Sequence, residues 1–209
     1  MIPQNINYRE FIGTLTAVIV ALTVHEYAHA RMADECGDGT PRAAGRLSLN
    51  PLDHLDVFGT LMIILMSLKH FGLGWAKPVP VNPYNFRHPR ADNIKVSLAG
   101  VATNMALAVV LAIPFMLGLL RVGPFDYAWL LAEVARVNVV IAFFNVIPIP
   151  PLDGSHVLAT LLPLNAARAY EQIVGRFGFL ILIMLLMTGV IGSIIGPPAF
   201  FVLRILHLD

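Results

Sequence analysis

The stretch FIGTLTAVIVALTVHEYAHARMA, residues 11–33, decides the class of fold. It is apolar over most of its length, and a helix of roughly 20 such residues crosses the hydrocarbon core of a bilayer. Its polar side chains include three threonines and, close to its C-terminal end, the cluster His25, Glu26 and His29. The stretch therefore predicts a transmembrane helix that carries ionisable groups where burial in lipid is costly.

The composition of the whole chain indicates a membrane protein. Of its 209 residues, 57% are hydrophobic and 13% are charged, and the mean hydropathy is +0.73, whereas soluble domains are roughly 45–50% apolar and about 25% charged. Cys36 is the only cysteine, so an intrachain disulfide framework is excluded. The formal net charge of +1 gives no strongly basic surface, and we expect no nucleic acid among the partners.

Three further stretches are long and apolar enough to cross the bilayer, namely residues 96–120, 129–147 and 177–195. Residues 57–68 are apolar but too short for a full crossing, which favours a re-entrant segment that enters the membrane and returns to the same side. The Gly-Pro-Pro sequence at 196–198 is expected to interrupt the last span. Residues 199–208 are then expected to form a short helix in the membrane interface.

We therefore expect an all-α membrane protein, a multi-pass bundle of about four to five transmembrane helices with one re-entrant segment. Residues 1–209 are expected to form one intramembrane domain, with a core at 11–163 and a C-terminal helical region at 164–209. Residues 1–10 lack the pattern of a cleavable signal peptide, so the first span is expected to remain in the protein.

Cationic residues are distributed unevenly along this topology. Eight of them lie between positions 31 and 95, whereas the opposite predicted face carries Arg9 and Arg121. Cytoplasmic loops gather Lys and Arg, so we assign the eight to the cytoplasm, which requires residues 57–68 to re-enter rather than cross. This predicts a multi-pass protein of the cell membrane with its reactive groups near the cytoplasmic side. The eight residues are Arg31, Arg42, Arg46, Lys69, Lys77, Arg87, Arg90 and Lys95.

Residues 25–29 read HEYAH, an HExxH pattern. On a helix, His25 and His29 lie one turn apart on the same face and can bind one metal ion. Neutral imidazoles suit zinc (Zn²⁺), and a catalytic zinc site keeps one of four positions for water. Bound zinc lowers the pKa of that water, and a neighbouring carboxylate, here Glu26, can take its proton as a general base. The pattern indicates hydrolytic chemistry, and the alternative is a pair of histidines that only stabilise helix packing.

A third protein ligand is expected in the segment NVIPIPPLDG, residues 145–154. Its three prolines end the preceding helix, and irregular backbone at membrane depth survives only around protein or a cavity. With one re-entrant segment, the helices that end near positions 33 and 147 run parallel, so Asp153 reaches the same leaflet as the HExxH pattern. The alternative for Asp153 is an ordinary Asp-Gly turn. His54 and His156 are less favoured candidates, interpreted as polar or interfacial residues.

These motifs make the chain resemble the site-2 protease family of intramembrane zinc metalloproteases, in its compact bacterial and archaeal branch. The resemblance covers residues 14 to about 162 and rests on the HExxH pattern and the later Leu-Asp-Gly. It implies that His25, His29 and Asp153 bind zinc. It also implies that Glu26 activates the attacking water and that Asn145 helps to hold the scissile carbonyl.

Two further segments resemble this family. Its middle core helix has a GPxxN pattern, and here residues 100–104 keep the glycine and the asparagine but have Val101 in place of the proline. Asn104 is then either a purely structural interhelical hydrogen-bonding residue or a part of the active site. Residues 74–81, GWAKPVPV, resemble a membrane-associated strand whose edge can pair with an unwound substrate. The alternative is a loop that Trp75 anchors at the membrane interface.

The sequence thus predicts a zinc endopeptidase that hydrolyses peptide bonds in or near transmembrane segments of other membrane proteins. The resemblance implies a single-pass substrate already trimmed by another protease, as in regulated intramembrane proteolysis, with the lipid bilayer as a second partner. An alternative from another class is a membrane metal transporter or metal sensor that uses the same ligands, although no inverted repeat is visible. A third is a proteolytically silent scaffold, which would not require Glu26.

Overall fold

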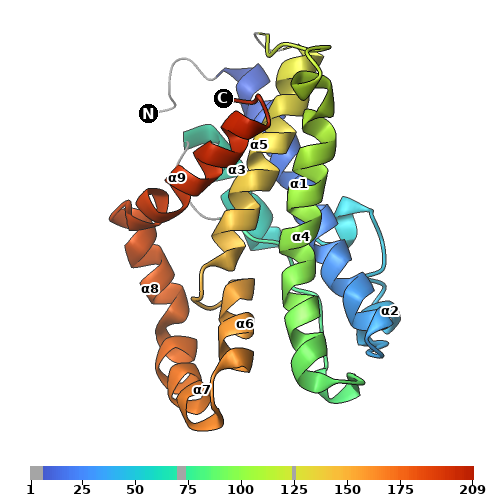
Figure 1. The fold of residues 1–209 in the computed structure, drawn as a ribbon, viewed down its shortest axis with the longest axis vertical. Coiled ribbons are helices and arrows are strands. Elements are labelled where there is room, and N and C mark those ends of the chain that lie inside the picture. The colour runs from blue at the N-terminus through green and yellow to red at the C-terminus, as the bar shows by residue number, and fades with distance from the viewer. Residues whose placement is uncertain (1–6, 70–73, 124–125) are drawn as a thin grey trace.

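The computed structural model describes residues 7–69, 74–123 and 126–209, and most of these residues are helical (Figure 1). Three long helices form the centre, namely α1 (Tyr8–Glu35), α4 (Pro89–Met116) and α5 (Tyr127–Val146), and they pack against one another. Helices α1 and α5 run in the same direction, and α4 is antiparallel to both. This is the arrangement that the sequence predicts for the helices that carry or precede the two candidate motifs.

Small residues explain how closely the three central helices approach one another. In lipid the hydrophobic effect does not drive helix association, so close van der Waals contact and interhelical hydrogen bonds must do so. Alanine allows the backbones to approach, and the buried core of this bundle is rich in it. The buried alanines of the three helices include Ala17, Ala21, Ala28 and Ala30 on α1, Ala108 and Ala112 on α4, and Ala128, Ala132, Ala135 and Ala142 on α5.

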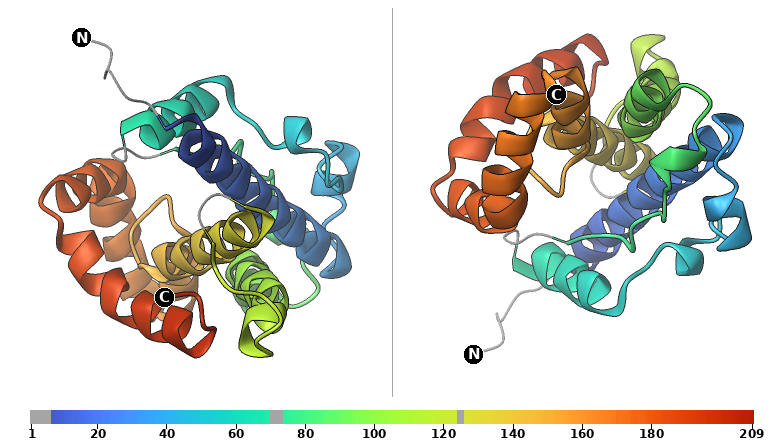
Figure 2. Two further views of the ribbon diagram at one scale, coloured as in Figure 1. Left: turned by 90° about the horizontal axis from the view of Figure 1, so that it is seen from above. Right: turned by 90° about the horizontal axis from the view of Figure 1, so that it is seen from below.

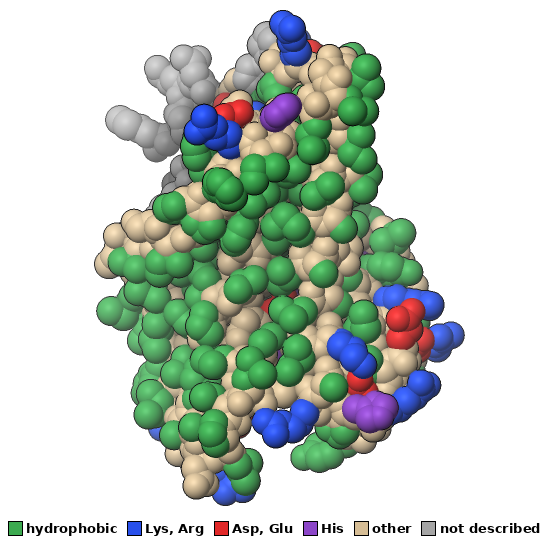
Figure 3. All heavy atoms as spheres, in the orientation of Figure 1, with side chains coloured by type: hydrophobic (Ala, Val, Ile, Leu, Met, Phe, Trp, Pro, Cys, Tyr) green, Lys and Arg blue, Asp and Glu red, His purple; other side chains and the backbone are tan. Residues whose placement is uncertain are grey.

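Four helical stretches in the described part of the chain are long and apolar enough to cross a membrane, namely α1, α4, α5 and Leu164–Met187. The last combines α7 (Leu164–Tyr170), the π-helical turn η3 (Glu171–Gly175) and α8 (Arg176–Met187). Figure 3 shows hydrophobic side chains over the middle of the visible face and charged side chains near its ends. The chain is therefore a multi-pass helical membrane protein, within the range of span numbers that the sequence predicts.

The segment between α1 and α4 contains α2 (Thr40–Ala43), the 3-10 turn η1 (Pro51–Asp53), α3 (Val57–Lys69) and the 3-10 turn η2 (Pro83–Asn85). Helix α3 has 13 residues and therefore rises about 20 Å, less than the roughly 30 Å of bilayer hydrocarbon. It packs against α1. Its length agrees with the prediction that it does not cross the membrane alone, and its re-entry stays a prediction.

In place of the strand expected at 74–81, the described residues form one isolated antiparallel bridge, between Leu55 and Ala76. The backbone N–H of Lys77 donates to the carbonyl oxygen of His54 at 2.7 Å. Pro78 and Pro80 have no N–H to donate, so the backbone pairing does not continue into a ladder. Segment 74–81 therefore forms no strand beyond this bridge.

The C-terminal region differs from the sequence prediction, which placed a break at 196–198 and an interfacial helix at 199–208. Helix α8 ends at Met187, Gly189 has φ +75°, and α9 (Val190–Ile205) continues through Pro197 and Pro198. Glycine adopts this left-handed conformation without a steric penalty and so ends a helix, whereas prolines are tolerated inside membrane helices. Helix α9 packs along α5, on the side away from α1 (Figure 2).

Candidate metal centre

Helix α1 presents His25 and His29 toward α4. Both residues are buried, and Gly100 of α4 lies directly against their imidazoles. A Cβ atom at position 100 would lie 2.5 Å from His25 Cε1 and 2.6 Å from His29 Nε2. Any larger residue there would displace the imidazoles, so the glycine of the 100–104 pattern makes room for the two histidines.

Asp153 reaches the imidazoles through the irregular segment that follows α5. Helix α5 ends at Val146, and the prolines at 148, 150 and 151 disfavour a continued helix before α6 (Asp153–Leu161) begins. A Cβ on Gly154 would collide with the carbonyl oxygen of Val146. The glycine therefore lets the first turn of α6 pack tightly on the end of α5, and this packing fixes the position of Asp153.

The C-terminal region supports the same irregular segment at two points. The hydroxyl of Tyr170 donates a hydrogen bond to the carbonyl oxygen of Pro148 at 3.0 Å. Gly178 of α8 lies so close to Pro150 that an added Cβ would lie 2.7 Å from the Pro150 carbonyl oxygen. Helices α7 and α8 thus rest on the chain that leads to Asp153.

The side chains of His25, His29 and Asp153 meet at one place. Asp153 Oδ2 lies 3.1 Å from His25 Nε2 and 3.3 Å from His29 Nε2, and the two Nε2 atoms are 3.0 Å apart. Three ligands of a tetrahedral zinc ion, each about 2.0–2.1 Å from the metal, lie about 3.3 Å from one another. In the described part of the chain, these residues form a group whose spacing suits a metal ion.

The other ring nitrogen of each imidazole indicates where its proton lies. His25 Nδ1 is 2.6 Å from Asn104 Oδ1, and His29 Nδ1 is 2.7 Å from the backbone carbonyl oxygen of Val96. Both partner oxygens can only accept a hydrogen bond, so each neutral imidazole carries its proton on Nδ1. Each therefore turns an unprotonated Nε2 toward Asp153.

Three atoms with lone pairs and no proton thus converge. Asp153 Oδ2 is buried and has no hydrogen-bond partner among the residues that the structure describes, and neither Nε2 has a proton to give it. A buried group in this state is costly unless a cation or extra protons offset the repulsion. Two imidazoles and one carboxylate are a donor set for catalytic zinc with one position left for water. The residues present therefore fit zinc.

Glu26 lies on α1 beside His25 and is half-buried. Its charge acts on a buried cation of the loop region, Arg46. Burial lowers the pKa of the Arg46 guanidinium, and the negative charges of Glu26 and Asp53 oppose that shift. Glu26, the candidate base, is thus near enough to Arg46 for their charges to interact.

Asn145 lies in the last turn of α5 and is half-buried. Its side-chain nitrogen donates to the carbonyl oxygen of Ile141 at 3.0 Å. An amide nitrogen carries two hydrogens, and this bond uses one of them. The suggested role of Asn145 at the scissile carbonyl stays a prediction.

The two less favoured histidines do not belong to the ligand group. His54 is buried, and its Nε2 lies 2.7 Å from the carbonyl oxygen of Ser48. His156 is exposed on α6. Both observations agree with the interpretation of these residues as polar or interfacial.

The sequence alone did not connect Asn138 or Arg46 to the site, whereas the structure connects Asn138 to the candidate site and Arg46 to the 74–81 segment. Asn138 is fully buried on α5, and its Oδ1 accepts a hydrogen bond from Asn104 Nδ2 at 2.7 Å. Arg46 donates to the carbonyl oxygen of Pro78 at 3.0 Å and also to that of Lys77. An amide inside an apolar span is itself a signal, because it must find a partner. Arg46 lies in a polar loop and gives no such signal.

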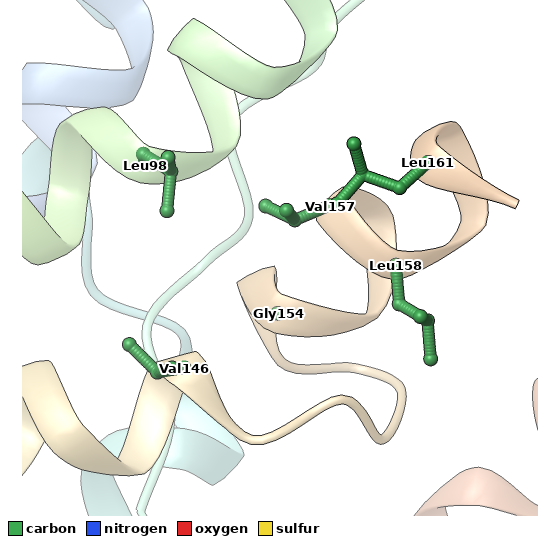
Figure 4. A pocket seen from close by; sticks show the side chains of 6 residues that line it. All are labelled: Leu98, Val146, Gly154, Val157, Leu158 and Leu161. Carbon is green, nitrogen blue, oxygen red and sulfur yellow. The ribbon is translucent and has the colours of Figure 1, made fainter.

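An apolar cavity of about 210 Å³ opens between α4, the end of α5 and α6, and its wall includes Gly154, which follows Asp153 (Figure 4). A cavity with an apolar lining offers water few hydrogen-bond partners. This side of Asp153 therefore suits apolar groups rather than a path for water. The lining residues are Leu98, Val146, Gly154, Val157, Leu158 and Leu161.

Comparison with known proteins gives a family match and several similar chains. Residues 119–187 match the family model described as Peptidase family M50. Three similar proteins carry the name "Putative zinc metalloprotease". YwhC of Bacillus subtilis (strain 168) is 35% identical over 191 residues, covering 86% of this chain and 82% of YwhC. Rip2 of Mycolicibacterium smegmatis is 32% identical over 183 residues, covering 85% of this chain and 68% of Rip2. MJ0611 of Methanocaldococcus jannaschii is 30% identical over 154 residues, covering 74% of this chain and 73% of MJ0611. No solved structure matches the chain.

Proposed function

The chain belongs to peptidase family M50, the site-2 protease family, and is a zinc metalloprotease. From this premise we propose that it hydrolyses peptide bonds in or near the transmembrane segments of other membrane proteins. The observation that carries the proposal is the convergence of His25, His29 and Asp153. The two histidines belong to α1, which is a candidate membrane span. A substrate must therefore bring its scissile bond to a group that lies within or close to the bilayer.

In this proposal His25, His29 and Asp153 hold the zinc ion. Bound zinc lowers the pKa of water to about 7 and polarises a carbonyl group. Glu26 accepts the proton of the attacking water and delivers it to the leaving nitrogen. Asn145 donates its second amide hydrogen to the scissile carbonyl oxygen and so stabilises the charge that develops there.

Segment 74–81 is proposed to hold the substrate in an extended conformation. A helical substrate hides its peptide groups in hydrogen bonds between residues i and i−4, so it must unwind before cleavage. The edge that carries the Lys77 N–H is already used, by its hydrogen bond to His54 and by the bridge of Ala76 to Leu55. A substrate strand would then add to the other edge by β-augmentation.

For the topology we propose one domain over residues 1–209 in the cell membrane, with α3 re-entrant and the candidate site near the cytoplasmic side. The charge distribution supports this proposal, because a re-entrant α3 keeps the eight cationic residues between positions 31 and 95 on one face. The substrate is proposed to be a single-pass membrane protein processed in regulated intramembrane proteolysis.

The substitution Glu26→Gln tests the proposal in proteoliposomes that contain zinc-loaded enzyme and a single-pass substrate. We expect zinc content to stay at the wild-type level while the cleavage rate falls by about 10² to 10⁴, the usual contribution of a general base. Glu35→Gln is the matched control, since Glu35 lies on the same helix in an ion pair with Arg31. Unchanged cleavage by Glu26→Gln would reject Glu26 as the base.

The same proteoliposomes separate the protease from the alternative of a metal transporter or sensor. A transporter would move zinc into the vesicles at a rate that depends on the three ligands, without cleavage of any substrate. A protease would cleave the substrate and show no such flux. Flux without cleavage by the wild-type protein would overturn the proposed function.

A further inference from the structure

Two fully buried asparagines connect the ligand group to the helix bundle, Asn104 of α4 and Asn138 of α5. Asn104 Oδ1 is 2.6 Å from His25 Nδ1. Asn104 Nδ2 donates to the carbonyl oxygen of Ala21 at 3.0 Å and to Asn138 Oδ1 at 2.7 Å. Asn138 Nδ2 in turn donates to the carbonyl oxygen of Val134 at 2.8 Å. The chain of hydrogen bonds therefore passes through all three central helices.

Two backbone carbonyls fix the orientation of these amides. A carbonyl oxygen can only accept, so the Asn104 atom that faces Ala21 must be the nitrogen, and the oxygen of Asn104 then faces His25. In the same way, the carbonyl of Val134 requires the nitrogen of Asn138, which turns its oxygen toward Asn104. Reversing either amide would bring two oxygen atoms together in a buried place, at the cost of unpaired polar groups.

We propose that Asn138 and Asn104 act as a relay of positioning residues that holds His25 in the tautomer whose unprotonated Nε2 faces the metal. The proposal rests on the proposed zinc site. Asn104 touches His25 directly, and Asn138 acts only through Asn104. The proton on His29 is held differently, by the backbone carbonyl of Val96, so side chains control the tautomer of one ligand and the backbone controls that of the other.

The relay explains why two polar side chains are kept inside an apolar bundle. Without it, the imidazole of His25 could carry its proton on Nε2, which would direct an N–H at the metal position. Hydrogen-bond partners of metal ligands typically contribute about 10-fold to 100-fold in metal affinity. The relay thus joins the orientation of a side chain on α5 to zinc binding on α1.

The zinc dissociation constant of the detergent-solubilised full chain, measured by competition with a chelator, tests the relay. We expect Asn104→Leu to raise this constant about 10-fold to 100-fold, and Asn138→Ala to raise it by up to about 10-fold. Asn138→Asp is the conservative variant, because a buried, protonated carboxyl can accept from Asn104 and donate to Val134. It should restore the constant to within about threefold of the wild type.

Absorption bands of the cobalt-substituted protein give a second readout, since they report the geometry of the ligands and do not depend on activity. Thr23→Val is the matched control: Thr23 is buried on α1, and its hydroxyl donates within that helix to the carbonyl oxygen of Ile19 at 2.7 Å. It should lower thermal stability without changing the zinc constant or the cobalt spectrum.

Three outcomes would overturn the proposed relay or the proposed metal site on which it rests. If Asn138→Ala and Thr23→Val have the same zinc dissociation constant and the same cobalt spectrum, Asn138 is purely structural. If Asn138→Ala and Asn138→Asp weaken zinc binding equally, the oxygen at position 138 that accepts from Asn104 does not control the affinity for zinc. Full zinc binding by His25→Ala would instead reject the proposed metal site itself. If Asn104→Leu does not fold, the two Asn138 variants decide the question alone.

Discussion

Two carboxylates, the buried Asp38 and the half-buried Asp153, have opposite hydrogen-bonding states. Asp38 follows α1 and accepts hydrogen bonds from the backbone N–H of Thr40 at 3.1 Å, the backbone N–H of Asn82 at 2.7 Å and the side chain of Asn85 at 2.8 Å. Asp153 Oδ2 has no donor and faces two imidazole nitrogens. Asp38 is satisfied by donors of its own chain, whereas the unpaired oxygen of Asp153 is what the proposed role as a metal ligand requires.

The electrostatics of Asp38 follow from those partners. Burial raises the pKa of its carboxyl, but the hydrogen bonds from Thr40, Asn82 and Asn85 lower it by more, so the pKa of Asp38 lies below its usual value. Asp38 is therefore a negative charge that the fold stabilises without any metal ion. Asp153 has no comparable set of donors, and substitutions at the two positions should consequently have different effects.

The largest effect is expected for Asp153→Ala. Loss of one of three protein ligands should weaken zinc binding on the order of 100-fold or more, as measured by metal analysis and chelator competition. The free energy of unfolding of the zinc-free protein should not fall, because the substitution removes an unpaired buried charge. Full zinc occupancy in this variant would remove Asp153 from the site, and a large loss of zinc-free stability would make it a structural carboxylate like Asp38.

A smaller effect on the same site is expected for Gly100→Ala. The added methyl group would occupy the place of the two imidazoles and displace them, which should raise the zinc dissociation constant about 10-fold to 100-fold. Gly192→Ala is the control, since a Cβ at this position of α9 meets no atom within 4 Å. Equal zinc constants for the two variants would mean that Gly100 does not shape the site.

Asp38→Ala should give the reverse pattern. It removes the charged acceptor of the donors on Thr40, Asn82 and Asn85, so the free energy of unfolding should fall by about 2 kcal/mol. The zinc dissociation constant of the folded fraction should stay unchanged. Denaturant unfolding of the zinc-free protein measures the first quantity, and a zinc titration measures the second. A changed zinc dissociation constant without a loss of stability would contradict the structural role of Asp38.

The smallest effect concerns pH. Because the folded pKa of Asp38 lies below its unfolded value near 3.8, its contribution to stability is complete above that value and is lost as pH falls through the folded pKa. The stability difference between wild type and Asp38→Ala should thus be constant from pH 7 to about pH 5 and shrink below about pH 4. Denaturant unfolding of the two zinc-free proteins across this pH range measures the stability difference. A stability difference that grows on acidification would mean that the pKa of Asp38 is raised rather than lowered by folding.

The parts of the site that follow local rules could be predicted from the sequence. The spacing of His25 and His29 requires only a helix, and Asp153 could be singled out because three prolines mark irregular backbone directly after an apolar span. Asn138 could not be paired with Asn104 in this way, because their contact depends on the rotation of two helices about their axes. The orientation of a helix in a bundle is set by tertiary packing, which a local pattern does not specify.

Two features of the fold were predicted wrongly or in part, and each has a physical reason. The break in the C-terminal region was placed at the prolines of 196–198, but a glycine that adopts a positive φ ends a membrane helix more effectively than a proline inside one. The strand expected at 74–81 is reduced to one bridge, since two prolines remove backbone donors and a side chain replaces a neighbouring strand. Both outcomes depend on partners that lie far away in the sequence.

The C-terminal arm formed by α7, η3 and α8 is less buried than the other candidate spans: 11% of its most apolar part is buried, against 39% in α1. Yet Tyr170 and Gly178 of this arm touch the prolines that lead to Asp153. A displacement of the arm would therefore disturb the packing of the segment that precedes Asp153. A candidate span that is mostly exposed thus supports the backbone that carries Asp153.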